Sequence, residues 1–271
     1  IYLTGRGRIF REYWGAVRYQ GTFNDPNQLA FFLFMMILLL YLYRCRFGDR
    51  SFPVFYVLAL PVIAASKSTG ILLGVLIFTV LAVLHALYRV GCRKGVSMKV
   101  WTLGIVIGVV LFGLFLWWIW PAADFDVKTV DYNMLTRIQE KIWKVAHGGL
   151  LGLFLDRGME KLVLYPQYLL YGAGEGGFDR FTLASQVNEI HCCLFSVMFC
   201  YGLIPTLCLL VWLGRKLRYA DAAMACAVMG LLAESFFLVN YRQPMLWMIL
   251  LYGSVVRMDG DGERTSIPVA E

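Results

Sequence analysis

Long uncharged apolar segments recur along this chain and constrain its fold more than any other feature. The clearest is 100–120, a stretch without a charged side chain that ends in LWWIW. A helix needs about 20 apolar residues to cross the hydrocarbon core of a bilayer, and tryptophans concentrate at its interfaces. Charged residues make up 16% of the sequence, whereas a soluble domain has about 25%. We therefore predict an integral membrane protein.

The apolar segments predict an all-α fold, a polytopic membrane protein with about seven transmembrane helices in one integral membrane domain over residues 1–271. A break at 66–69 separates the short second segment from the third, and Pro205 is expected to kink the fifth. The chain begins without Met or a signal-peptide pattern, which we interpret as a fragment or an internal start with spans missing upstream. The predicted spans are 27–43, 52–65, 70–90, 100–120, 192–213, 222–239 and 245–256.

The basic residues predict the orientation. The connectors at 44–50, 89–99 and 214–221 carry ten Lys or Arg against two acidic residues, and along seven spans they fall on one side. The positive-inside rule makes that side cytoplasmic. The polar stretch 121–191 is then a large extracytoplasmic loop, and the tail 258–271 is cytoplasmic. Much of the net charge of +7 thus reflects topology, so we expect a lipid bilayer and no nucleic acid as partner.

Within the loop, residues 132–147 show the apolar spacing of an amphipathic helix, with Arg137, Lys141 and Lys144 on a neighbouring stripe. One interpretation is a helix that lies on lipid headgroups, which we favour for the two lysines. For Arg137 we favour function, because other predicted outer segments each carry a cation.

Those further cations predict a site for a diphosphate. Lys67 lies in the break between the second and third spans, and Arg242 lies in the last outer turn. Arginine pairs with phosphate in bidentate fashion, so Arg137, Lys67 and Arg242 are candidate diphosphate ligands. Ordinary contact with lipid headgroups is the alternative for each of them. Further candidates are Arg18, Arg157 and Arg180.

Three acid–base candidates border the same predicted surface. His191 lies where the loop re-enters the membrane, with Glu189 close in sequence, and Glu234 lies in the sixth span. A histidine at a span end is commonly structural, but His191 borders the same predicted surface as Arg137, and this favours function. Glu234 is a functional candidate because carboxylates inside membranes are costly, although pairing with a nearby arginine is equally consistent.

The glycine cluster GAGEGG at 172–177 favours a turn. It lacks the strand–turn–helix context of a nucleotide fingerprint. Backbone N–H groups at Gly172 and Gly174 are nevertheless candidate anion donors. We predict no metal site, because the adjacent His191, Cys192 and Cys193 cannot easily bind one zinc ion together. No cofactor is expected either.

Five motifs in a fixed order resemble the O-antigen ligase and O-antigen polymerase superfamily, multi-span glycosyltransferases of the GT-C class. The resemblance covers residues from about 21 to 210, and its specificity lies in the order and spacing of the motifs around one large outer loop. The motifs are GTFNDPNQLA, ASKSTGILL, RIQEKIW, YPQYLLYGAGEGGF and EIHCCLFSVMFCYGLIP.

The resemblance implies a metal-independent enzyme on the outer face of the bacterial cytoplasmic (inner) membrane. Its donor is an undecaprenyl-diphosphate-linked oligosaccharide, and its acceptor is a sugar hydroxyl of a glycan or lipid-linked glycan. The family's loop arginine, in the pattern RxxxxxW, corresponds to Arg137 with Trp143, and its histidine corresponds to His191. The chain departs from the family at Cys192, where Asn is usual, at Lys67, where Arg is usual, and in its number of spans.

These inferences predict a polymerase of cell-surface polysaccharide, of the O-antigen, capsule or exopolysaccharide type. The alternative is a ligase that moves the glycan to a different acceptor, such as lipid A core. A membrane transporter is an alternative of another class. It would predict inverted repeats and discontinuous helices around a midplane site, whereas the sequence shows no repeat and its polar residues gather at one predicted surface.

Overall fold

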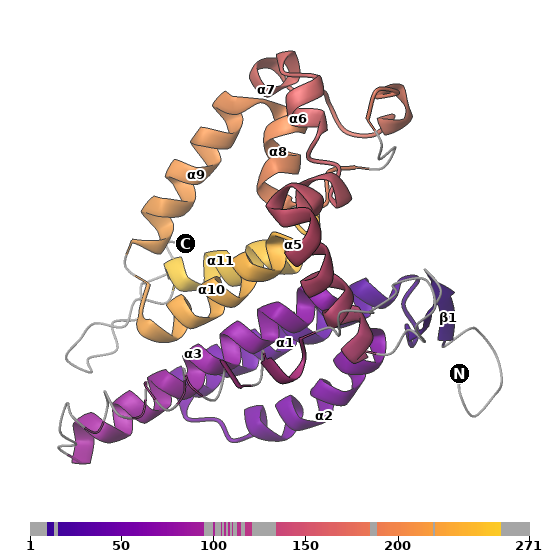
Figure 1. Ribbon diagram of the computed structural model, residues 1–271. Coiled ribbons are helices and arrows are strands. Elements are labelled where there is room, and N and C mark those ends of the chain that lie inside the picture. Colours follow the sequence, from indigo (N-terminus) through magenta and orange to yellow (C-terminus); the bar gives the residue numbers. More distant parts are fainter. Residues whose placement is uncertain are drawn as a thin grey trace.

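The structure is a computed structural model, and it is mostly helical (Figure 1). It describes residues 10–13, 16–94, 134–184, 189–218 and 220–255, with scattered positions between 100 and 120. The predicted fourth span is therefore described only in part, and the start of the loop and the tail 258–271 lie outside the described residues. The elements are β1 (Phe10–Tyr13), β2 (Ala16–Tyr19), α1 (Pro26–Phe47), α2 (Ser51–Ser66), α3 (Thr69–Lys94), α5 (Met134–Asp156), α6 (Lys161–Leu164), α7 (Gln167–Tyr171), the 3-10 turn η1 (Phe178–Arg180), α8 (Cys193–Tyr201), α9 (Leu203–Leu217), α10 (Ala222–Ser235) and α11 (Pro244–Val255).

The first predicted span is confirmed as a helix, α1, with clear signals at both ends. The Asp25 side chain accepts a hydrogen bond of 2.7 Å from the Asn27 N–H, and Pro26 opens the helix. Gly48 ends it in the left-handed conformation, and its N–H donates to the Arg44 carbonyl. The helix continues past the predicted end at residue 43 to Phe47, because no residue before Gly48 breaks it.

The predicted break at 66–69 is also confirmed. Helix α2 ends at Ser66, and α3 begins at Thr69. Lys67 between them has φ 52°, and among the described residues it is the one non-glycine residue with positive φ. The break therefore arises from a left-handed turn at a lysine and separates two apolar helices.

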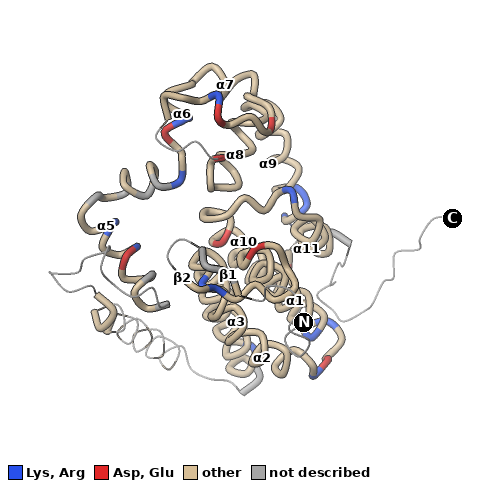
Figure 2. Tube along the Cα trace, turned by 90° about the vertical axis from the view of Figure 1, so that its right-hand side faces the viewer, with Lys and Arg blue, Asp and Glu red and all other residues tan. Residues whose placement is uncertain are grey.

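Within the described residues, two helices are long and apolar enough to cross a membrane, Pro26–Phe47 and Thr69–Cys92. The helices Ser51–Ser66 and Ala222–Ser235 are apolar but shorter. Figure 2 shows Lys, Arg, Asp and Glu mainly at helix ends, in connections and along α5–α7, while most of the length of α1, α2 and α3 carries none. The seven-span architecture remains a prediction.

The fifth predicted span is divided into two helices. Its break lies at Gly202, with φ 89°, three residues before the proline that was expected to kink it. Helices α8 and α9 diverge from an apex at this glycine, beside α7 (Figure 1). A Cβ at Gly202 would lie 2.5 Å from the Leu170 carbonyl oxygen, so close packing against α7 requires glycine there.

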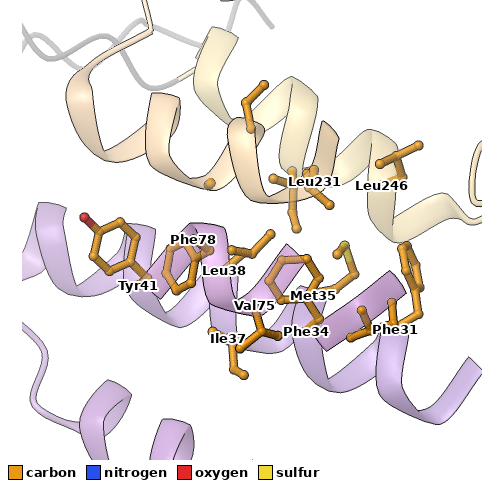
Figure 3. Packing of buried hydrophobic residues seen from close by; sticks show 14 of the residues in the cluster. Phe31, Phe34, Met35, Ile37, Leu38, Tyr41, Val75, Phe78, Leu231 and Leu246 are labelled. Atoms are coloured by element: carbon orange, nitrogen blue, oxygen red, sulfur yellow. The ribbon is translucent and has the colours of Figure 1, made fainter. Parts of the chain in front are cut away.

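The main core lies between α1, α3, α10 and α11. Figure 3 shows Phe34, Met35 and Leu38 of α1 beside Phe78 of α3, with Leu231 of α10 above them. The Phe78 ring packs edge-on against Tyr41 at 5.0 Å between centroids. A second, smaller core consists of Met159, Phe181, Ile190, Cys192 and Phe199.

The helix predicted at 132–147 is present, but it runs further toward the C-terminus. Helix α5 starts at Met134 and reaches Asp156, with a non-helical residue at Gly149 (φ 60°, ψ −165°). It leads to α6 and to the second core (Figure 1). The polar N-terminal segment contains an antiparallel hairpin, β1–β2, which the all-α prediction did not include.

Candidate functional site

A cluster of charged and phenolic side chains joins four segments of the chain. The Arg242 guanidinium lies 3.2 Å (Nε) from Glu175 Oε2 and 2.8 Å (Nη1) from Glu189 Oε2. Glu175 Oε1 also accepts hydrogen bonds from the Tyr201 hydroxyl at 2.5 Å and from the Tyr241 hydroxyl at 2.8 Å. We call these five residues the Arg242 cluster. It connects the glycine segment, the residues before α8, the end of α8 and the α10–α11 turn.

The electrostatics of the cluster favour its ionised form. The Tyr201 hydroxyl, followed by Tyr241 and Arg242, holds the pKa of Glu175 below its usual range. Burial opposes the charge of Arg242, but Glu189, followed by Tyr241, raises the pKa of Arg242 above its usual value. At neutral pH the guanidinium is therefore charged and is shared between two carboxylates.

The glycine segment 172–177 forms a turn that packs on the end of α8. The Ala173 N–H donates to the Phe199 carbonyl, and the Gly174 N–H donates to the Cys200 carbonyl, both at 2.8 Å. A Cβ at Gly172 would lie 2.6 Å from the Cys200 carbonyl oxygen. The Gly172 N–H donates to Tyr168. These N–H groups are thus engaged by protein carbonyls, which favours the turn over an anion site.

His191 lies between the Arg242 cluster and the second core. Its N–H donates to the Arg157 carbonyl at 2.9 Å, while Ile190 and Cys192 on either side are buried. Burial lowers the pKa of His191, and the charge of Arg157 lowers it too, followed by that of Lys161, while Glu189 opposes them. The half-buried imidazole is therefore neutral near pH 7, as a general base must be.

Arg157 links the His191 segment to the helical core. Its Nη1 donates to the Phe237 carbonyl at 2.8 Å, and its guanidinium lies 4.9 Å above the Phe237 ring. A Cβ at Gly70 would lie 2.7 Å from Phe237 Cβ, so the start of α3 packs on the same residue. Arg157 thus contacts the backbone of His191 and Phe237, and Phe237 in turn contacts Gly70 at the start of α3.

The remaining predicted cations have different surroundings. Arg18 is buried, and it donates to the Ser66 carbonyl at 2.7 Å and to Asn27 Oδ1 at 2.8 Å. The exposed Arg180 donates to the Ala173 carbonyl and lies over the Phe181 ring. Arg137 lies in the first turn of α5, and its side chain is outside the described part of the structure.

Glu234 lies buried at the end of α10. Asn240 Nδ2 donates to its Oε2, and Glu234 Oε1 has no hydrogen-bond partner among the described residues. In the described part of the chain, Glu234 pairs with no arginine, contrary to one expectation. Its hydrogen-bond partner there is Asn240. Asn240 also donates to Ser235 Oγ at 3.0 Å.

Metal binding finds no support in the described residues. They contain no group of three or more His, Cys, Asp or Glu side chains that could hold a metal ion. All seven cysteines are free.

Of the residues singled out from the sequence, the structure brings together Arg242, Glu189 and the segment that carries Glu175 and the two glycines. The start of α3, three residues after Lys67, contacts Phe237, which also accepts a hydrogen bond from Arg157. Sequence reasoning missed Tyr201, Tyr241 and Phe237, because a tyrosine at a helix end has no local signal for a carboxylate some 26 or 66 residues away.

Comparisons of the chain with protein-family models, with curated proteins and with solved structures each give no match.

Proposed function

We propose that this chain is a polymerase of cell-surface polysaccharide that transfers a glycan from undecaprenyl diphosphate to a sugar hydroxyl. The observation that carries the proposal is the neutral imidazole of His191, just before α8, whose backbone N–H donates to the carbonyl of the cationic Arg157. A neutral base next to cations suits a reaction that deprotonates an acceptor and releases an anionic leaving group.

The proposed reaction is a single displacement. The acceptor oxygen bonds to the anomeric carbon of the donor, the bond from that carbon to the diphosphate oxygen breaks, and His191 takes the hydroxyl proton. Undecaprenyl diphosphate leaves as an anion, so it needs charge stabilisation rather than a general acid. One well-placed donor contributes about 2.7–4 kcal/mol to such stabilisation. Arg137 and Lys67 fill this role in the proposal, which therefore requires no metal ion.

The proposed location is the bacterial cytoplasmic membrane, with seven spans in this chain and the site facing outward. The two long apolar helices support a membrane protein. The basic connectors at 44–50, 89–99 and 214–221 support the orientation, because basic loops stay cytoplasmic.

Two other functions are distinguished by experiment. A ligase has the same chemistry with a different acceptor, so it accumulates full-length lipid-linked chains when inactivated. A transporter is favoured by one observation, the buried carboxylate of Glu234 in an apolar helix. A transporter predicts that substitution of Glu234, rather than of His191, blocks export of the glycan.

The test replaces His191 with Ala, or Arg137 with Ala, in cells whose surface glycan is then separated on a gel. The matched controls are His147→Ala, an exposed histidine that stacks on Trp143, and Arg50→Ala, an exposed arginine before α2. The proposal predicts loss of the long-chain ladder and accumulation of single lipid-linked repeats in the first two variants only. A normal ladder in His191→Ala would refute it.

A further inference from the structure

We infer that Arg242 is a positioning residue for His191, which it holds through Glu189 while it joins that segment to the glycine turn through Glu175. The role of His191 rests on the proposed function, but the link between Arg242 and the His191 segment does not. The inference replaces the expectation that Arg242 binds the diphosphate.

The first step is the position of Glu189. It lies two residues before His191, and its Oε2 accepts from Arg242 at 2.8 Å. The His191 imidazole has no side-chain hydrogen bond to another described residue, so its orientation follows from its backbone. That backbone is held by the buried Ile190 and Cys192, by the Arg157 carbonyl and by this ion pair. Arg242 is the link that comes from the α10–α11 turn.

The second step is the rigidity of the other carboxylate. Glu175 lies in a turn whose Ala173 and Gly174 N–H groups both donate to the end of α8. Tyr201 and Tyr241 also donate to its carboxylate. Glu175 is thus a fixed acceptor, and Arg242 bridges from it to Glu189 on the segment that leads to His191.

The third step concerns what Arg242 can bind. Two carboxylates face its guanidinium, so the three charged groups carry a formal charge of −1 together. A diphosphate would have to displace one of these carboxylates and approach the other against like charge. Tyr241 occupies a further face, with its hydroxyl 3.0 Å from Arg242 Nη2. The surroundings suit a structural link more than an anion site.

The first experiment needs no glycan. Protein in lipid nanodiscs is compared by hydrogen exchange for the wild type, Arg242→Ala, Glu189→Ala and the control Arg50→Ala. We expect exchange at 189–192 to rise about tenfold or more in both cluster variants, because local opening becomes less costly, and to stay unchanged in Arg50→Ala. Unchanged exchange in Arg242→Ala would overturn the inference.

Inorganic pyrophosphate tests the competing role. Its binding to the same nanodiscs, measured by titration calorimetry, is expected to be equal in the wild type and Arg242→Ala, and weaker in Arg137→Ala. A weaker interaction in Arg242→Ala would make Arg242 an anion ligand and overturn the inference. An unchanged affinity in Arg137→Ala alone would instead count against the proposed function.

Steady-state turnover separates a positioning role of Arg242 from a role in donor binding. The donor is lipid-linked glycan extracted from the producing cells. Arg242→Ala is expected to reduce kcat by about 10²-fold, as misplacement of a reacting group does, with the donor KM unchanged. A raised donor KM with an unchanged kcat would overturn the inference. If His191→Ala turned over the glycan at the wild-type rate, the proposed function would be refuted. The hydrogen-exchange result would still decide whether Arg242 holds the His191 segment.

The pH profile adds a signature that a purely structural change would not give. The charged groups that face His191 are Arg157, Lys161 and Glu189. Arg242→Ala frees the Glu189 charge, so the acidic limb of kcat moves to higher pH. Glu189→Gln keeps an acceptor for Arg242 but removes the charge, so the limb moves to lower pH. Shifts in the same direction would contradict the inference.

Discussion

Gly74 of α3 and Gly230 of α10 face each other where the two helices cross. A Cβ at Gly74 would lie 2.9 Å from the Gly230 carbonyl oxygen, and a Cβ at Gly230 would lie 3.1 Å from the Gly74 carbonyl oxygen. Small residues let helix backbones approach closely, and this crossing places Glu234, one turn after Gly230, against α3.

Substitution at this crossing is expected to destabilise the fold. Gly74→Ala places a methyl group against a backbone carbonyl that cannot move aside, so we expect a loss of about 1–3 kcal/mol in the free energy of unfolding. Gly214→Ala in α9 is the matched control, since nothing lies within 4 Å of its Cβ position. It should instead stabilise the helix by about 0.5–1 kcal/mol. Unfolding in detergent measures the free energy of both variants. If both variants were destabilised, or both stabilised, the role of the close crossing would be contradicted.

Removal of Arg18 is expected to loosen the α2–α3 break. Arg18→Met keeps the apolar stem but leaves the Ser66 carbonyl and Asn27 Oδ1 without these donors. Hydrogen bonds to charged groups contribute about 1.5–3 kcal/mol, so the loss should lie in that range. Limited proteolysis at 66–69, together with unfolding, measures it. Arg50→Ala serves as control, and a variant Arg18→Met as stable as the wild type would exclude this role.

Glu234 and Asn240 are expected to be coupled. Glu234→Leu removes an acceptor from Asn240, and Asn240→Ala removes the hydrogen-bond donor to Glu234 Oε2. Each single variant should cost about 1–3 kcal/mol, because a buried polar group loses its partner, whereas the double variant should cost less than the sum. Denaturant unfolding of the four proteins gives the coupling. Strict additivity would show that the pair is not coupled.

Acid is expected to weaken the Arg242 cluster. The pKa of Glu175 is held below its usual value of 4.5, chiefly by the Tyr201 hydroxyl. A carboxylate with a lowered folded-state pKa stabilises the fold above its unfolded-state pKa and loses this contribution as pH falls through the folded-state value. The protection of the amides at 172–177, measured as hydrogen exchange corrected for its intrinsic pH dependence from about pH 7 down to about pH 3, should therefore fall at the acid end. Glu175→Gln should remove that dependence.

Sequence patterns predicted the helices best where the cause is local. Asp25 and Pro26 define the start of α1, and the polar residues at 66–69 mark the break before α3. The break in the fifth predicted span was expected at Pro205 but lies at Gly202. It arises from the close approach of Leu170 in α7, and sequence periodicity contains no information about that contact.

The candidate site was predictable in its residue types but not in its pairings. His191, Glu189 and Arg242 were each selected from their places in the predicted topology. The sequence offered no means to learn that Arg242 meets two carboxylates, since Glu175 and Glu189 lie 67 and 53 residues before it. Arg18 likewise was grouped with the surface cations, whereas burial makes it a partner of the backbone at Ser66.

The left-handed conformation of Lys67 has a consequence for how its amine can be studied. An L-residue with a side chain carries a cost of about 1–2 kcal/mol there, which glycine avoids. Replacement by glycine therefore removes the ammonium group and relaxes the backbone at once. Activity and stability then change in opposite directions at one position. A Lys67→Gly variant that is more stable but less active would therefore identify the amine as the functional group.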